Sequence, residues 1–155
     1  MEARHLICIT GWSVWHELQL LREHPVVDQR TLGQILIDKA NEGVNVYIMI
    51  WDPSQVLGKA GMAPTDDEET FNFFKPTRVH CAKVPREIDF SKDQFLSDIG
   101  QKTWNNFNYS HHQKSVICDT AGTGSLRRLV GFIGGIDLTN GKQRIDMTLM
   151  FIQLI

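Results

Sequence analysis

A strand, helix, strand pattern in the first third of the chain constrains the fold most strongly. The apolar run His5–Thr10 predicts a strand that ends at Gly11. Thr31 then stands where a helix N-cap is expected, apolar residues follow at helical spacing, and Gly43 stands where such a helix ends. The apolar run Val44–Trp51 follows directly. This order is typical of a β-α-β unit and predicts a sheet that contains parallel strands.

The rest of the chain extends this unit. Thr65, with four acidic residues after it, predicts a helix that runs through Phe74, because first-turn acids complement the helix dipole. Pro85–Asn108 is polar and irregular and predicts a long loop. Four further strands are predicted, at Val79–Val84, Lys114–Cys118, Leu129–Ile133 and Met147–Ile152. We therefore expect an α/β fold, with a mixed, largely parallel β-sheet flanked by helices, in a single domain over residues 1–155.

Composition excludes several classes of protein. The 155 residues include 16 Lys and Arg against 18 Asp and Glu, and this net charge of −2 argues against a nucleic-acid partner. The three cysteines form neither a metal-binding pair nor a disulfide framework, which is typical of a reducing compartment. No apolar run approaches the roughly 20 residues of a membrane helix, and the first residues do not resemble a signal peptide. We expect a cytoplasmic protein whose membrane contact is peripheral.

Residues that can carry chemistry gather in the segment around His112 and Lys114. Side chains two positions apart share one face of a strand, so the imidazole and the ammonium are expected to project together. A neutral imidazole can attack a phosphodiester, and a lysine can stabilise the charge on its oxygens. Asp119 lies seven positions after His112 and is expected to face the other way, in a supporting role.

A second group follows the predicted strand Leu129–Ile133. Gly134 and Gly135 let the backbone approach a ligand closely and leave N–H groups for an anion. Asp137 then stands where it can orient the lysine or position a substrate. The two groups together predict a site for a phosphate group.

These residues resemble a known family. His112, Lys114 and Asp119 match the His-x-Lys-x4-Asp (HKD) motif of the phospholipase D superfamily. With the preceding His111, the segment resembles the motif of the plant-type enzymes in particular. The segment from Phe132 to Leu138 resembles the family's "FVGGIDL". Three further segments resemble the plant-type sequences, namely Leu6–Val14, the Thr31–Val44 unit and Gly61–Thr70. The resemblance covers residues 4–141, and residues 142–155 form a divergent tail.

The resemblance implies a phospholipase D, which hydrolyses phosphatidylcholine and related phospholipids to phosphatidic acid and a head-group alcohol. It implies that His112 is the nucleophile that forms a phosphohistidine and that Lys114 holds the phosphate. Asp119 would support the motif, and Gly134, Gly135 and Asp137 would line the substrate pocket. No metal ligand is assigned, and no cofactor is expected in this chain. The resemblance implies calcium as a cofactor of the parental family.

The chain departs from the family pattern in one respect that affects its mechanism. It carries one His-x-Lys-x4-Asp motif, whereas the plant-type enzymes carry two and use the second histidine as the acid. One explanation is a fragment that requires a second HKD half in cis. Another is a homodimeric phosphodiesterase or nuclease that pairs two copies of His112. The third is an inactive remnant that binds lipid or a partner.

Overall fold

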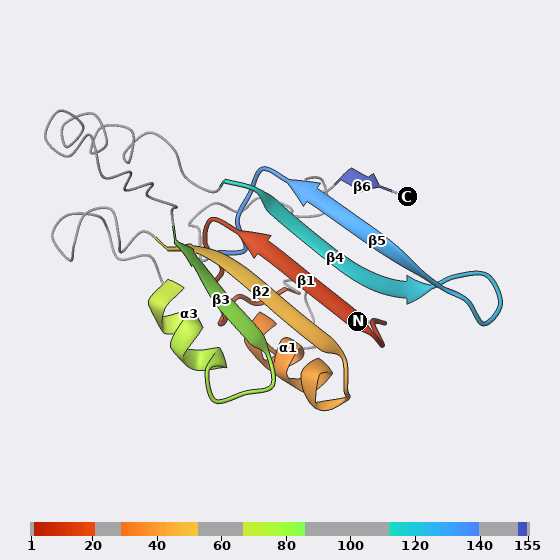
Figure 1. Cartoon of the computed structure of the whole chain (residues 1–155), viewed down its shortest axis with the longest axis horizontal. Coiled ribbons are helices and arrows are strands. Elements are labelled where there is room, and N and C mark those ends of the chain that lie inside the picture. The colour runs from red at the N-terminus through yellow and green to blue at the C-terminus, as the bar shows by residue number, and fades with distance from the viewer. Residues whose placement is uncertain (1, 21–28, 53–66, 86–111, 140–151, 155) are drawn as a thin grey trace, which may run out of the picture.

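Six strands and two helices form the described part of the chain (Figure 1). The structure is a computed structural model, and it describes residues 2–20, 29–52, 67–85, 112–139 and 152–154. In chain order the elements are β1 (Leu6–Gly11), α1 (Leu32–Asn41), β2 (Asn45–Asp52), α3 (Asp67–Phe74), β3 (His80–Pro85), β4 (Lys114–Ala121), β5 (Arg127–Gly134) and β6 (Ile152–Leu154). Neither described helix is long and apolar enough to cross a membrane.

The described strands form one mixed sheet in the order β3-β2-β1-β4-β5-β6. β1, β2 and β3 are parallel to one another, while β4 is antiparallel to β1, and β5 and β6 each run antiparallel to the strand before them. Four of the six described strands, β1, β2, β3 and β5, therefore point the same way. The predicted α/β fold with a mixed, largely parallel sheet is confirmed.

Local sequence accounts for the β1-α1-β2 unit. The Thr31 side chain accepts a hydrogen bond from the Gln34 amide, and the Gln34 side chain accepts one from the Thr31 amide, which forms a capping box. Gly43 then adopts a φ of 94°, a conformation that residues with a Cβ rarely take. The helix thus begins and ends where the sequence predicts.

The other predicted elements differ from the observed ones mainly in their limits. β4 extends to Ala121 and β5 begins at Arg127, so both strands are longer than predicted. α3 carries its acidic first turn as expected, but Thr65 lies outside the described residues, as does most of the predicted loop Pro85–Asn108. Of the predicted strand Met147–Ile152, only Ile152 is described, and it begins β6.

The hydrophobic core lies on one face of the sheet. Alternating residues of the central strands are buried there, among them Ile7 and Ile9 of β1 and Ile48 of β2. They pack with Leu36 of α1 and Phe74 of α3, and both helices lie on the same side of the sheet in Figure 1. On the opposite face three large side chains remain 38 to 46% exposed, namely Tyr47, Ile117 and Ile133. The described helices therefore cover one face of the sheet.

Candidate active site

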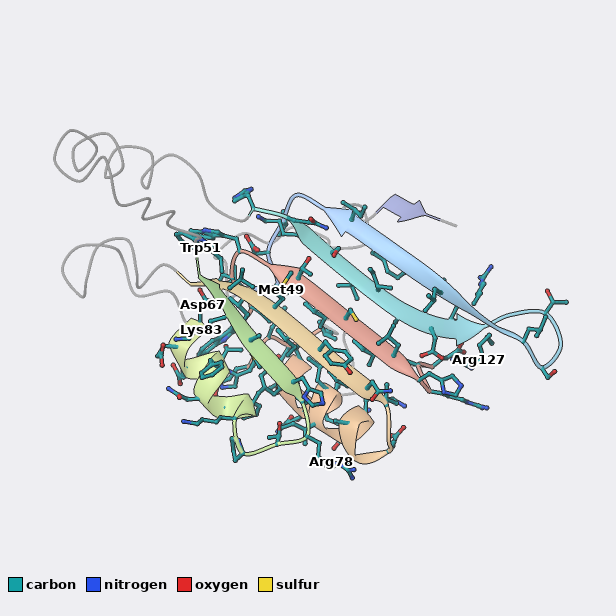
Figure 2. The ribbon with its side chains drawn as sticks, viewed as in Figure 1. Met49, Trp51, Asp67, Arg78, Lys83 and Arg127 are labelled. Carbon is teal, nitrogen blue, oxygen red and sulfur yellow. The ribbon has the colours of Figure 1, made fainter. Side chains whose placement is uncertain are left out.

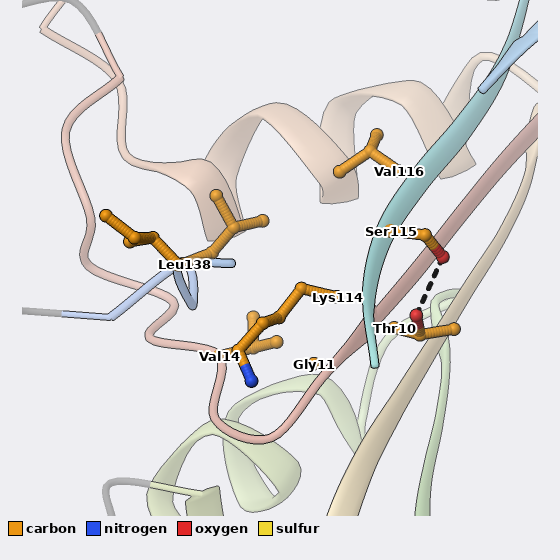
Figure 3. A pocket seen from close by; sticks show the side chains of 8 residues that line it. Thr10, Gly11, Val14, Lys114, Ser115, Val116 and Leu138 are labelled. Carbon is orange, nitrogen blue, oxygen red and sulfur yellow. Dashed lines mark hydrogen bonds between the residues drawn. The ribbon is translucent and has the colours of Figure 1, made fainter. Parts of the chain in front are cut away.

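The candidate site lies where β1 ends and β4 begins. Because these two strands are antiparallel, Thr10 at the end of β1 pairs with Ser115 near the start of β4. Their hydroxyl oxygens are 2.7 Å apart, as the dashed line in Figure 3 marks. This pairing brings the loop after Gly11 next to the segment that carries His112 and Lys114.

Lys114 is buried, with 4% of its side chain exposed. Figure 3 shows it on the same side of β4 as Val116, with Ser115 on the opposite side. Its Nζ lies 3.2 Å from Oδ2 of Asp137 and donates to the carbonyl oxygen of His112 at 3.0 Å. An ammonium has three N–H donors, and the described groups take two of them. One donor is thus left for a further acceptor such as a phosphate oxygen.

Asp137 links the lysine to the loop after β1. Its Oδ1 accepts hydrogen bonds from the backbone amides of Trp12 at 2.7 Å and Ser13 at 3.1 Å. A Cβ on Gly11 would lie 3.3 Å from the same oxygen and 3.1 Å from the Ser13 carbonyl, so glycine permits this close approach. The carboxylate therefore holds the ammonium and the loop in one arrangement.

The same loop is also held from the side of α3. Ser13 Oγ donates to Oδ1 of the buried Asp67 at 2.9 Å, and the Val14 amide lies 3.2 Å from that oxygen. Nδ1 of His16 lies 3.1 Å from the Thr70 hydroxyl. Buried polar contacts of this kind restrict the backbone, because breaking them leaves unsatisfied groups. The loop after β1 is thus a fixed support for the candidate site.

His112 lies two residues before the first residue of β4 and is exposed. Its ring centroid is 6.2 Å from that of Trp12, with the planes inclined at 51°. The strand begins at Lys114, so strand periodicity does not extend to His112, and the two side chains differ in burial. Lys114 instead contacts the main chain of His112.

Gly134 and Gly135 lie at the same end of the sheet. Gly134 is the last residue of β5 and pairs directly with Lys114. A Cβ on Gly135 would have nothing within 4 Å, and its φ lies outside the left-handed region. Packing among the described residues therefore does not require glycine at this position, and the space beside it is open.

Asp119 lies at the other end of β4, about 17 Å from Lys114 along the strand, at five residues of ~3.3 Å each. Its carboxylate accepts hydrogen bonds from the amides of Leu6 at 2.8 Å, His5 at 2.9 Å and Arg4 at 3.2 Å, and it pairs with Arg127. Burial acts to raise the pKa of Asp119, but these hydrogen bonds outweigh burial and hold its pKa well below the usual range. Figure 2 shows Arg127 and Trp51 at opposite ends of the sheet.

The residues of the site do not fit a calcium ion. Asp119 is committed to backbone amides and Arg127, and Asp137 to backbone amides and Lys114. Across the described ranges, no three His, Cys, Asp or Glu side chains gather as metal ligands would. The cavity beside Lys114 has a volume of about 10 Å³, which is roughly room for one water molecule.

The structure thus brings five of the six predicted residues to one edge of the sheet and places the sixth elsewhere. His112, Lys114, Gly134, Gly135 and Asp137 lie at the edge where β1 ends, and Asp119 lies at the opposite edge. Sequence reasoning missed the contribution of Gly11 and Trp12. The position of Gly11 directly after an apolar strand was the one available sign of a close approach, but it does not show that Asp137 is the residue that approaches.

Comparisons with known proteins agree with the motifs. The sequence model of one family, described as Phospholipase D, matches residues 1–151. Phospholipase D alpha 1 of Carica papaya is 43% identical over 151 residues, and the proteins of that name from Zea mays and Arabidopsis thaliana are 44% and 42% identical. Each alignment covers 91% of this chain and 18% of the relative. The chain therefore spans about a fifth of the length of the relatives it matches.

Proposed function

This chain belongs to the phospholipase D family, and from that premise we propose that it carries one half of a phospholipase D active site. The substrate is phosphatidylcholine or a related phospholipid, and the products are phosphatidic acid and the head-group alcohol. The observation that carries the proposal is the Lys114 ammonium, held by Asp137 and by the main chain of His112.

Lys114 binds the phosphate in this proposal. Its remaining N–H donor interacts with a non-bridging oxygen of the diester and stabilises the charge that develops there during attack. Asp137 holds the ammonium in its buried position. In this proposal the phosphate approaches through the open space beside Gly135, and Gly134, which pairs with Lys114, brings the backbone next to it.

His112 is the nucleophile. A ring nitrogen forms a bond to phosphorus, and the bond between phosphorus and the choline oxygen breaks. The leaving alkoxide takes a proton from a general acid, which is the histidine of a second HKD half. Water then attacks phosphorus, gives a proton to that histidine and releases phosphatidic acid and free His112.

The second half is supplied in cis in a longer chain or by a second copy of this one. Asp119 supports the motif from a distance, because it fixes the start of β1 against β4. The described residues give calcium no role. We propose a cytoplasmic location at the surface of a membrane, since the lipid substrate supports the membrane contact and three cysteines without a disulfide framework support a reducing compartment.

The test uses a phosphatidyl diester of 4-nitrophenol, since nitrophenolate leaves without an acid and the second half is not required. We expect a burst of up to about one nitrophenolate per chain and a covalent phosphatidyl adduct on His112 by mass spectrometry. His112→Ala should abolish both. His80→Ala is the matched control, because His80 is exposed and lies at the start of β3, away from the site.

A burst that persists in His112→Ala would overturn the assignment of the nucleophile. Choline release from phosphatidylcholine vesicles, measured together with sedimentation velocity, then identifies the source of the acid. A monomer with a burst but no choline release supports a half-site, whereas a dimer that releases choline supports two symmetric copies. Choline release from a monomer would contradict both arrangements.

A further inference from the structure

Trp12 contacts the candidate nucleophile through its ring. The indole lies next to two aromatic rings, that of His112 at 6.2 Å and that of Trp51 at 6.0 Å between centroids. The planes of Trp12 and Trp51 are inclined by 19°, so these two rings are stacked. Trp51 is 5% exposed, and Figure 2 shows it at the end of β2. A buried ring therefore supports Trp12, which in turn contacts an exposed histidine.

The main chain of Trp12 is fixed at the same time. Its amide donates to Oδ1 of Asp137, whose Oδ2 pairs with Lys114. Lys114 Nζ donates to the carbonyl oxygen of His112. The contacts form a closed circuit from the Trp12 ring to His112, then to Lys114, to Asp137 and back to the Trp12 amide. Trp12 is thus the residue that touches the imidazole and also anchors the partner of the ammonium.

The orientation of the His112 imidazole depends on a contact of this kind. It lies outside β4 and is exposed, and within the described part of the chain no group forms a hydrogen bond with its ring nitrogens. An exposed imidazole changes rotamer readily, whereas in-line attack requires the nitrogen to lie within a narrow range of positions. Aromatic contact with a ring that is itself held by Trp51 restricts that motion.

We propose that Trp12, supported by Trp51, is a positioning residue that sets the orientation of the His112 imidazole. The catalytic part of this inference depends on the proposed function, but the orientation of the ring does not. Trp12 does not touch the phosphate in this scheme. It acts through His112, and it couples the orientation of His112 to the position of Lys114 through Asp137.

The test measures the ¹H and ¹³C resonances of the His112 imidazole in Trp12→Leu and Trp12→Phe. A neighbouring indole shifts these resonances by its ring current, so Trp12→Leu should move them and Trp12→Phe should move them less. Trp15→Leu is the matched control, because Trp15 lies in the same loop and its ring is 4.6 Å from that of His16. It should move the resonances of His16 and leave those of His112 in place.

The nitrophenolate burst provides the functional readout. Trp12→Leu should slow the burst by at least about tenfold at unchanged substrate affinity, and Trp12→Phe should recover most of the rate. An unchanged His112 resonance in a folded Trp12→Leu protein would overturn the inference. A shifted resonance with an unchanged burst would also overturn it. If wild-type protein gives no burst, the proposed function fails, and the resonances alone then decide whether Trp12 orients the ring.

Discussion

Lys114 and Asp137 form an ion pair of 3.2 Å in which the side chains are only 4% and 10% exposed. Two charges at this depth lose most of their hydration, so each depends on the other and on its hydrogen bonds. The carboxylate also receives two backbone amides, and the ammonium also donates to a carbonyl. The pair therefore holds the loop after β1 against the segment before β4, and it is also part of the candidate site.

Asp137→Asn should destabilise the protein by about 3 kcal/mol, because it leaves the buried ammonium of Lys114 without a counter-charge. Urea unfolding measures this effect. Asp38→Asn is the control, since the Arg30–Asp38 pair is about half exposed and should contribute no more than about 1 kcal/mol. Equal losses in the two variants would show that burial of the Lys114–Asp137 pair has no energetic consequence.

Lys114→Met combined with Asp137→Asn should recover part of that stability, because the unpaired charge is then gone. The same double variant should not recover the nitrophenolate burst, which requires the ammonium. Lys114→Met alone should slow the burst by at least about tenfold. A burst at the wild-type rate in either variant would contradict the role of the lysine.

Asp119 should make the stability of the protein depend on pH in the acid range. Its pKa in the folded chain is lowered, so its stabilising effect is fully present above the unfolded value of about 3.9 and is lost as pH falls towards the folded value. Wild-type protein should therefore lose stability from about pH 4 downward more steeply than Asp119→Asn. Urea midpoints between pH 2 and pH 7 test this, and parallel curves would contradict it.

Two glycines of the site should respond differently to alanine. Gly11→Ala forces a methyl group against the Ser13 carbonyl and the Asp137 carboxylate, and should cost about 1 to 3 kcal/mol. Gly135→Ala adds a methyl group in open space and should change stability by no more than about 0.5 kcal/mol. If Gly135 lines the phosphate pocket, its variant should bind the diester more weakly while remaining fully stable. Wild-type affinity would exclude that position from the pocket.

Cys81 should react slowly with alkylating agents in the folded protein. Burial raises the pKa of its thiol, and so does the negative charge of Asp67. The positive charge of Lys83 opposes them, and the resulting pKa is about 11. At pH 8 this leaves about one-hundredth of the thiolate of an unperturbed cysteine. Iodoacetamide labelling followed by mass spectrometry, in buffer and in urea, measures the difference. Equal labelling rates at Cys81 in both conditions would contradict the assigned environment.

The fold was predictable wherever local sequence determines it. The capping box of Thr31 and Gln34 and the stop at Gly43 involve residues close in sequence, so α1 was predicted well. The end of β4 was not, because Asp119 interrupts the apolar pattern and its carboxylate accepts from amides at and just before the start of β1, more than 110 positions away. A polar residue in a strand is acceptable when a distant segment provides its partners, and spacing along the chain does not reveal them.

The candidate site was predictable in its residues but not in its geometry. The motif spacing predicted His112, Lys114 and Asp137, which the structure places at one edge of the sheet. It did not predict the contact between Trp12 and His112, because the two residues meet only after β1 and β4 pair in antiparallel fashion. The predicted strand Lys114–Cys118 already separated Lys114 from Asp119, and the sequence predicted a supporting role for Asp119, but it did not identify the amides that this carboxylate binds.

The hydrogen bond from Trp12 to Asp137 joins residues 125 positions apart. A contact of such long range must offset a large loop-closure entropy, so it forms late, after the local β1-α1-β2 unit. During synthesis, the loop after β1 emerges long before the carboxylate that fixes it. Nascent chains that have not yet exposed Asp137 will therefore carry the β1-α1-β2 segment with an unformed site, and the geometry of the candidate site appears only after Asp137 has been synthesised.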